Sequence, residues 1–233
     1  MIILAIDTAL DACSAAVFDT TASKAIALQS QPMKRGHAEA LMPLIARVMK
    51  ESGIAFGSLD RIAVTTGPGS FTGLRVGLSA ARGIALAAGK PVVGVTTLTA
   101  YAAPVVAENG EQPIISAIDA RHDHVYFQVV GGDGSPLVKP KVAPIAHAIE
   151  AAQLGAPPHL VGNAAKILAD RWPAEMAPPF KVDSEVAPDI TWVAWVGAAV
   201  DPETAPPRPF YLRAPDAKPP ANPPLDVPQP TAS

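Results

Sequence analysis

Residues 60–95 read DRIAVTTGPGSFTGLRVGLSAARGIALAAGKPVVGV, and this stretch decides the fold. Its first part, Asp60–Thr66, is rich in β-branched residues and contains the apolar run Ile62–Val64, which is typical of a strand, and the glycine-rich Gly67–Ser70 predicts a tight turn. A helix is predicted over Phe71–Ala88, ended by a glycine, and a second apolar strand over Pro91–Val95. A strand, a crossover helix and a further parallel strand together indicate an α/β fold.

Two other stretches share one opening pattern, which indicates a weak internal duplication. Residues Ile2–Ile6 form an apolar strand followed by Asp7, and Ile114–Ile118 form another followed by Asp119. After each acid comes a loop and a second predicted strand, Cys13–Asp19 in the first case and Val125–Val130 in the second. We therefore predict two related α/β halves.

The remaining pattern predicts helices in both halves and a break between them. A helix is predicted over Gly36–Ser52, where apolar residues recur at helical spacing. Residues Pro104–Pro113 interrupt the pattern and predict a connection. A strand, a turn and a helix follow over 160–169, and a last helix over Thr191–Val200.

Composition excludes several classes of protein. The chain has 233 residues with a net charge of −3 and no block of like charges, which argues against a basic surface for nucleic acid. One cysteine excludes a disulfide framework, and no stretch predicts a signal peptide or a membrane span, so we expect a cytoplasmic protein without membrane contact. Prolines are concentrated after residue 200, so 201–233 is predicted to be a largely disordered tail in which 209–213 dock on the body.

The acids that follow the two opening strands are the first candidate site. Asp7 with Thr8, and Asp119 with Arg121, would face each other across a cleft, as in two-lobed proteins that hold nucleotide phosphates. Such loops usually contain glycine, because only glycine lets the backbone approach a phosphate closely. Neither loop contains one, so the residues indicate either a vestigial nucleotide site or plain strand-ending acids.

The helix over residues 71–88 is the second candidate, because it contains three glycines that each cost about 1 kcal/mol relative to alanine. Small residues on one face let another helix approach closely, from the same chain or from another subunit. We predict a subunit interface on the two helices of the first half. Its expected residues are His37, Leu41, Leu44, Val48, Gly73, Val76, Gly77, Ala80 and Gly83.

No catalytic residue and no metal site are predicted. The five histidines form no His-x-x-x-His pair, and Cys13 lies in the middle of a predicted strand, where an inert buried thiol is expected. The glycine-rich turn before the second helix lacks the lysine of a phosphate-binding P-loop, which leaves weak anion binding or simple turn geometry as alternatives.

These motifs resemble the TsaB (YeaZ) family, accessory proteins for threonylcarbamoyladenosine (t6A) synthesis on tRNA. The matching stretches, between Met1 and Arg213, are ILAIDTALDACSAAVFD, RGHAEALMPLIARVM, TTGPGSFTGLRVGLSAARGIALAAGKPVVGVTTL, SAIDARHDHVY and PFYLR. The resemblance implies an actin/Hsp70-like (ASKHA) α/β fold, with two lobes of mixed sheets flanked by helices. We expect the lobes at 1–103 and 104–200, with the interface helices in the first.

The resemblance also implies partners. The first is the catalytic TsaD paralogue, whose His-x-x-x-His metal motif aligns here with Thr97 and Tyr101. Neither side chain is an imidazole, so this chain is expected to be a non-catalytic scaffold without a metal. A TsaE ATPase and, only through the complex, tRNA are the other implied partners, and the chain alone is expected to form a homodimer. No cofactor is expected, apart from weakly bound ATP or ADP at the subunit junction.

Two alternatives belong to other classes of protein. A nucleotide-binding or nucleotide-hydrolysing actin-like enzyme would use Asp7 and Asp119, and the missing glycines argue against it. A metallopeptidase would bind stoichiometric zinc or iron, and neither a histidine pair nor a nucleophile with a base supports it.

Overall fold

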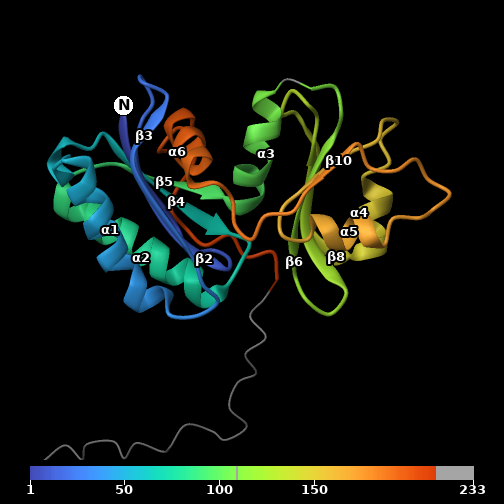
Figure 1. The fold of residues 1–233 in the computed structure, drawn as a ribbon, viewed down its shortest axis with the longest axis horizontal. Helices are drawn as coiled ribbons and strands as arrows, with labels where there is room; N and C mark the ends of the chain where they lie inside the picture. The colour runs from blue at the N-terminus through green and yellow to red at the C-terminus, as the bar shows by residue number, and fades with distance from the viewer. Residues whose placement is uncertain (109, 214–233) are drawn as a thin grey trace, which may run out of the picture.

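Two five-stranded mixed sheets organise the chain (Figure 1). The structure is a computed structural model that describes residues 1–108 and 110–213. The first sheet has the order β3-β2-β1-β4-β5, with β1 Ile2–Asp7, β2 Ala12–Asp19, β3 Lys24–Pro32, β4 Arg61–Gly67 and β5 Val92–Thr96. The second has the order β10-β9-β6-β7-β8, with β6 Ile114–Asp119, β7 His124–Val130, β8 Pro136–Pro144, β9 His159–Val161 and β10 Lys181–Asp183.

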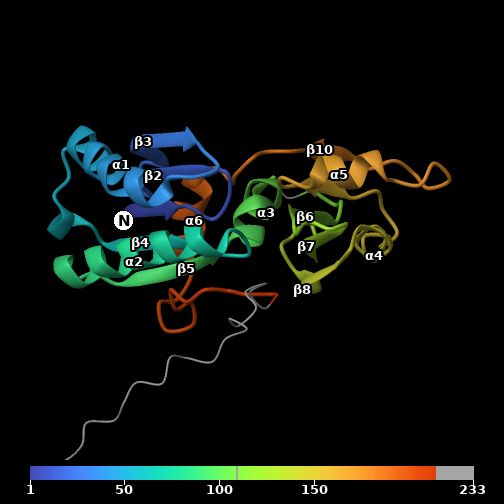
Figure 2. The same ribbon diagram turned by 90° about the horizontal axis from the view of Figure 1, so that it is seen from below.

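Helices lie on both faces of each sheet (Figures 1 and 2). They are α1 His37–Ser52, α2 Phe71–Ala88, α3 Thr97–Ala107, α4 Ile145–Ala151, α5 Ala165–Asp170 and α6 Ile190–Ala199, with a short 3-10 turn at Phe56–Ser58. The outer face of the first sheet is covered by α1 and α2, and that of the second by α4 and α5. Between the sheets lie α6 and α3, which contact each other. Within the part of the chain that the structure describes, no helix is long and apolar enough to cross a membrane.

The two sheets repeat one topology. In each, a central strand (β1 or β6) pairs antiparallel with the next strand and parallel with the strand that follows a helix. In the first sheet α1 precedes β4 and α2 precedes β5, and in the second α4 and α5 hold the same places before β9 and β10. This duplicated arrangement is the actin/Hsp70-like (ASKHA) fold, so the predicted fold class is confirmed.

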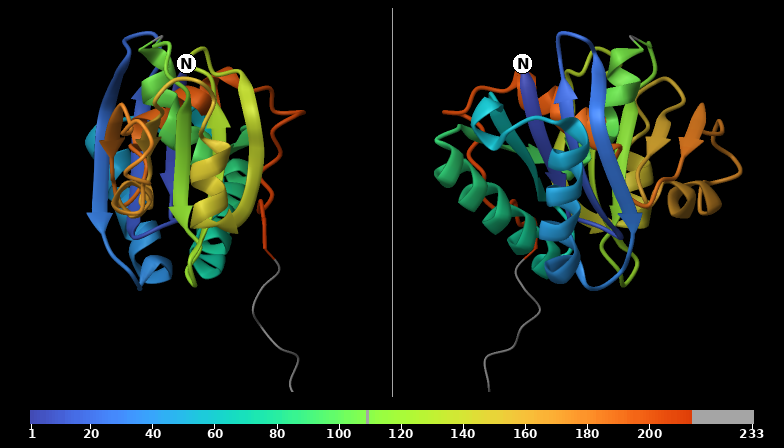
Figure 3. Two further views of the ribbon diagram at one scale, coloured as in Figure 1. Left: turned by 90° about the vertical axis from the view of Figure 1, so that its right-hand side faces the viewer. Right: turned by 60° about the vertical axis from the view of Figure 1, so that its left-hand side comes forward.

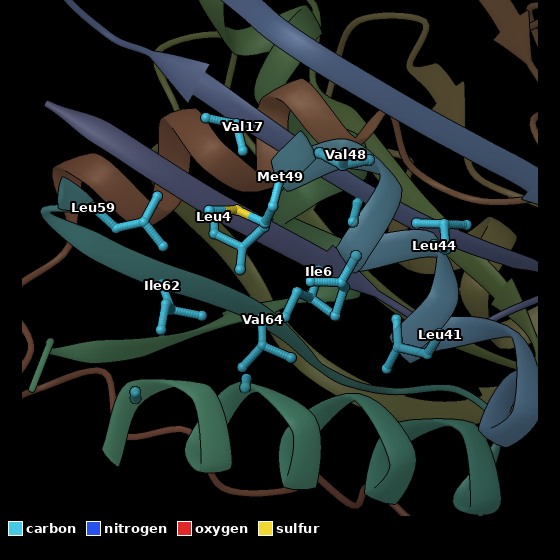
Figure 4. Close-up of a cluster of buried hydrophobic side chains, with 14 of the residues drawn as sticks. Leu4, Ile6, Val17, Leu41, Leu44, Val48, Met49, Leu59, Ile62 and Val64 are labelled. Carbon is cyan, nitrogen blue, oxygen red and sulfur yellow. The ribbon is translucent and has the colours of Figure 1, made fainter. Parts of the chain in front are cut away.

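The core of the first lobe follows from the apolar spacing of its sequence. β1 is buried along almost its whole length, as a central strand covered on both faces must be. In α1 the residues at helical spacing face that sheet, and Figure 4 shows Leu41, Leu44 and Val48 in one buried cluster with the strand residues Ile6 and Val64. The helix ends where Gly53 adopts a left-handed conformation.

The last helix crosses back to the first lobe, which corrects the expected lobe boundaries of 1–103 and 104–200. Ile190, Val193 and Ala194 of α6 are buried against the first sheet, not the second. The chain then continues along the first lobe, where the Gly94 N–H donates to Ala205 O at 2.9 Å. The residues of α6 are apolar on all sides of the helix, because it lies between two layers. Such a pattern in the sequence does not show which sheet the helix covers. The rest of the predicted disordered tail, 214–233, lies outside the described residues.

One further expectation needs correction, and several elements were not predicted. Residues 104–107, expected to begin a connection, form the last turn of α3, and Pro104 lies inside that helix. Burial of Leu98, Tyr101 and Ala102 stabilises α3 against the second sheet in spite of the lost backbone donor. The helices α3 and α4 and the strands β8 and β10 had no predicted counterpart. Three prolines in β8 conceal its strand character, and they are tolerated because β8 is an edge strand.

The glycines of α2 bring its backbone against the turn that follows β1. A Cβ at Gly69 would overlap the Ala9 carbonyl, and one at Gly73 would overlap the Thr8 carbonyl. Two hydrogen bonds fix this approach, from the Ser70 N–H to Ala9 O at 2.7 Å and from Thr8 Oγ1 to Gly73 O at 2.7 Å. By contrast, Gly83 is exposed on the same helix, and a methyl group added there would have no neighbour within 4 Å.

Two glycine-to-alanine changes in α2 should therefore have opposite effects on stability. Gly73→Ala forces a methyl group into the Thr8 backbone and should lower the free energy of unfolding by more than about 2 kcal/mol. Gly83→Ala adds helix propensity in open space and should raise it by about 0.5–1 kcal/mol. Urea unfolding of both variants measures the difference. Equal effects would contradict the backbone contact.

Candidate functional site

A cavity of about 510 Å³ lies between the two lobes. From the first lobe it is lined by Ala9–Asp11, after β1, and by Pro68–Thr72, where α2 begins. From the second lobe it is lined by Asp119–Arg121 and Asn163, and Phe210–Arg213 of the last segment complete the wall. The cavity is thus built by the loops that follow the central strands of both sheets, as the duplication predicts.

The polar groups of the second-lobe wall are largely engaged with one another. The Asp119 N–H donates to Asn163 Oδ1 at 2.9 Å, and Asp119 Oδ1 accepts the Arg121 N–H at 2.7 Å. Arg213 Nη1 donates to Ala120 O at 3.3 Å, which joins the last described residue to the second lobe. Asp11 and Asp119 face Arg121 and Arg213 around the cavity, so its two acids and two arginines balance in charge.

The loop after β6 has an unusual backbone. Arg121, His122 and Asp123 all have positive φ, at 60°, 49° and 64°. L-residues avoid this left-handed region at a cost of about 1 kcal/mol or more each, and glycine adopts it freely. The loop therefore has a conformation suited to glycine but carries side chains. Of these three residues, Arg121 lines the cavity.

The structure does not bring the four residues of the predicted nucleotide site together. Asp119 and Arg121 line the cavity, but Asp7 and Thr8 do not, and both are buried. The glycine face of α2 covers them, which is the physical reason that this part of the prediction is wrong. Asp7 Oδ1 accepts from Thr65 Oγ1 at 2.5 Å and from the Ala9 N–H at 2.9 Å.

Burial raises the pKa of the Asp7 carboxyl above its ordinary value, although Thr65, the Ala9 N–H and the nearby His37 partly oppose this shift. Its second oxygen, Oδ2, has no hydrogen-bond partner among the described residues. Cys13 beside it is also buried, and its pKa is raised to about 11 by desolvation and by Asp7. These groups suit a structural position, and neither faces the cavity.

The two positions that the resemblance leads us to compare with metal ligands, Thr97 and Tyr101, lie one turn apart on α3. Thr97 and Tyr101 are both buried, and the Tyr101 hydroxyl donates to Glu185 O at 2.8 Å. Over residues 1–108 and 110–213, no three His, Cys, Asp or Glu side chains lie close enough together to hold a metal ion.

Most of the predicted interface residues belong to the core of their own lobe. His37, Leu41, Leu44 and Val48 are buried under α1, and the His37 ring nitrogen Nε2 lies 3.1 Å from Leu10 O. Gly73 and Gly77 are buried against Thr8. For these six residues the predicted contact with a partner is wrong, because the face that the pattern marks as apolar is the face that covers the sheet.

The other three predicted residues lie at the surface of α2. Val76 and Ala80 are half-buried and Gly83 is exposed. On α1 the neighbouring Met42 is 50% exposed. The buried and the surface residues of the predicted interface lie on different faces of each helix. Assigning each position to a helical face from the sequence could therefore have separated the two sets.

The last segment contributes side chains that sequence reasoning did not assign to the cavity. The ring of Tyr211 stacks on Phe71 at the start of α2, with 5.1 Å between centroids. Arg75 places its guanidinium 3.9 Å from the centroid of Phe71. The backbone beside them is also fixed, because the Phe210 N–H donates to Thr66 O at 2.8 Å. This segment therefore fixes one wall of the cavity at the junction of the lobes.

The buried carboxyl gives a pH-dependent prediction. A raised pKa means that the folded state binds the Asp7 proton more tightly than the unfolded chain. Its contribution to stability is therefore full below the unfolded pKa and is lost as pH rises through the folded one. Asp7→Asn removes this loss, so its melting temperature minus that of the wild type should become more positive between about pH 4 and pH 8. Thermal unfolding across that range measures it, and a constant difference would refute the assignment.

The chain is similar in sequence and in structure to known proteins. The model of the family described as "TsaD: tRNA N6-adenosine threonylcarbamoyltransferase" matches residues 26–179. The tRNA threonylcarbamoyladenosine biosynthesis protein TsaB of Escherichia coli is 39% identical over 127 residues, which cover 54% of this chain and 54% of that protein. The chain thus spans about half the length of the curated relatives it first matches.

Other similarities extend over nearly the whole chain. An uncharacterized protein of Mycobacterium tuberculosis is 33% identical over 220 residues, which cover 93% of this chain and 94% of that protein. The solved structure of YeaZ from Pseudomonas aeruginosa has a TM-score of 0.72 and 27% identity, and the match covers 91% of this chain and 99% of that one.

Proposed function

Because this chain belongs to the TsaB (YeaZ) family, we propose that it is the non-catalytic scaffold of a t6A synthesis complex. The TsaD family model also matches residues 26–179 of the chain. In this role it pairs with the metal-dependent TsaD transferase subunit and supports its activity. The proposal rests on relatives that are named for tRNA threonylcarbamoyladenosine biosynthesis.

The observation that carries the pairing is the outer surface of α1 and α2, which lie side by side over the first sheet (Figure 3). Large apolar side chains are exposed on this surface beside charged ones. Leu86 is 86% exposed and Met42 50% exposed, and α2 also carries the small residues Ala80, which is half-buried, and Gly83, which is exposed. Exposed apolar surface of this kind favours burial against another protein, and small residues permit close approach of helices.

The same geometry supports a non-catalytic role for this chain. The positions of the metal ligands are held by Thr97 and Tyr101, which are both buried, and the Tyr101 hydroxyl donates to Glu185 O. The cavity between the lobes contains neither Asp7 nor a glycine in its second-lobe loop. Both features favour a scaffold over the nucleotide-hydrolysing alternative.

The other partners follow from this role. A TsaE ATPase would bind the surface formed by the pair, and tRNA would reach this chain through the complex. Weakly bound ATP or ADP would lie at the subunit junction rather than at Asp7. In the absence of TsaD, the same helices would form a homodimer.

Gly83→Leu tests the pairing without disturbing the fold. No atom lies within 4 Å of the added Cβ, so the variant should fold and unfold like the wild type or slightly more stably. The side chain blocks close approach of a partner helix, so the affinity for the TsaD paralogue should fall at least about tenfold. Isothermal titration calorimetry with light scattering measures this affinity.

A matched control is Gly57→Leu, an exposed glycine in the 3-10 turn that also has no neighbour within 4 Å. It should leave the affinity unchanged. If Gly83→Leu binds the paralogue as tightly as Gly57→Leu, this helical face is not the interface. Gly77→Leu is unsuitable, because its side chain would clash with Thr8 inside the lobe.

A further inference from the structure

The last segment, residues 201–213, lies in a seat on the first lobe. At the edge strand β5 the Gly94 N–H donates to Ala205 O at 2.9 Å, and a Cβ at Gly94 would lie 2.8 Å from Pro206 O. Glycine inside a strand often marks a place where another backbone approaches closely. The residue at position 94 therefore suits a sheet edge that the last segment covers.

A second glycine permits a contact of the same kind where β4 ends. The Phe210 N–H donates to Thr66 O at 2.8 Å, and a Cβ at Gly67 would lie 3.0 Å from Phe210 O. The ring of Tyr211 then stacks on Phe71, with 5.1 Å between the centroids. Backbone hydrogen bonds at two points and an aromatic contact thus fix the last segment on the first lobe.

The contact of the last segment with the second lobe is weaker. Arg213 Nη1 donates to Ala120 O at 3.3 Å, which is longer than most N–H···O hydrogen bonds. Leu212 is half-buried against an apolar cluster that contains Leu74 of the first lobe and Ile118 of the second. Side chains therefore reach the second lobe, whereas backbone hydrogen bonds hold the first.

This weaker contact lies at the cavity, far from a place where the chain itself crosses between the lobes. Figure 1 shows α3 passing into β6 at the upper end of the molecule and the last segment ending at the lower end, between the lobes. There Phe210–Arg213 form part of the cavity wall. Because the contact lies far from that crossing, it opposes a hinge motion of the lobes over a long lever arm.

The loop that receives Arg213 has an uncommon backbone. Ala120 comes directly before Arg121, His122 and Asp123, whose φ values are all positive. Residues other than glycine raise the energy of a loop in this conformation, and such residues are frequent in ligand clamps and in segments that switch. The acceptor of the Arg213 hydrogen bond therefore belongs to a loop of raised energy, as suits a contact that opens.

We propose that the last segment is a latch between the lobes. It stays seated on the first lobe, while its end, Leu212 with Arg213, holds the second lobe closed over the cavity and releases it when the lobes open. The end yields before the seat because it has the weaker contacts. This device acts within one chain and so goes beyond the proposed pairing with a partner.

Spin labels on the two lobes measure the opening. Gln31→Cys on β3 and Lys166→Cys on α5 place one label on each lobe at an exposed position, in a chain whose buried Cys13 is replaced by alanine. An excess of unlabelled chain ensures that only distances within one chain are recorded. Double electron–electron resonance then gives the distribution of distances between the two labels.

The deciding variant, Leu212→Ala with Arg213→Ala, removes the contact with the second lobe. Its matched control, Leu86→Ala with Arg208→Ala, removes the same two kinds of side chain at exposed positions. The deciding variant should give a longer and broader distribution of distances than the wild type, because the lobes separate at the cavity. The control should match the wild type. Equal distributions in the two variants would overturn the latch.

Amide hydrogen exchange shows whether the end alone is released. In the deciding variant the amides of Gly94 and Phe210 should exchange within about twofold of the wild-type rate, because their acceptors remain in place. Exchange at least about tenfold faster at both amides would overturn the division between seat and end, since the last segment would then detach as a whole.

A second variant displaces the seat. Gly94→Ala places a methyl group against Pro206 O, so the amides at positions 94 and 210 should exchange at least about tenfold faster than in the wild type. The distances between the labels should lengthen as they do in the deciding variant. Fast exchange at both amides with the lobes still closed would overturn the latch.

Discussion

The close contact between the backbone of α2 and the turn after β1 is the constraint on which the rest of the structure depends. Side chains at Gly69 and Gly73 would occupy the space of the Ala9 and Thr8 carbonyls, so only glycine permits it. The contact fixes the start of α2 over the central strand, and α2 in turn forms one wall of the cavity and the outer surface of the lobe. Glycine lowers the helix propensity of α2, and the tertiary contact that it permits offsets this loss.

This contact also decides what the strand-end acid can do. With α2 above it, Asp7 is enclosed by Thr65, Ala9 and His37, and burial favours its protonated form. A carboxyl in that position is hydrogen-bonded inside the lobe and does not line the cavity. Its counterpart Asp119 remains at the surface, where it fixes its own loop through the Arg121 N–H. The duplicated acids therefore have different roles, although the sequence pattern around them is the same.

The last segment joins features that are distant in the chain. It covers the edge strand β5 through Ala205, holds Arg82 through Pro207 and contacts the second lobe through Arg213. Tyr211 meets α2 at Phe71. The helix proposed to bind the partner is therefore in contact, on its other side, with the segment that joins the lobes. A change in either surface would affect α2, because the packed core of the first lobe leaves the helix little freedom to move independently.

The sequence by itself determined the duplicated α/β fold, most of the strands and the two outer helices of the first lobe, because apolar periodicity and glycine stops are local signals. It also identified the family through motifs between Met1 and Arg213. Only the tertiary structure decided which face each glycine and leucine presents. Leu41 and Gly77 proved to be core positions, and α6 proved to cover the first sheet. The physical reason is that periodicity marks an apolar face, whereas the partner of that face depends on how distant segments pack.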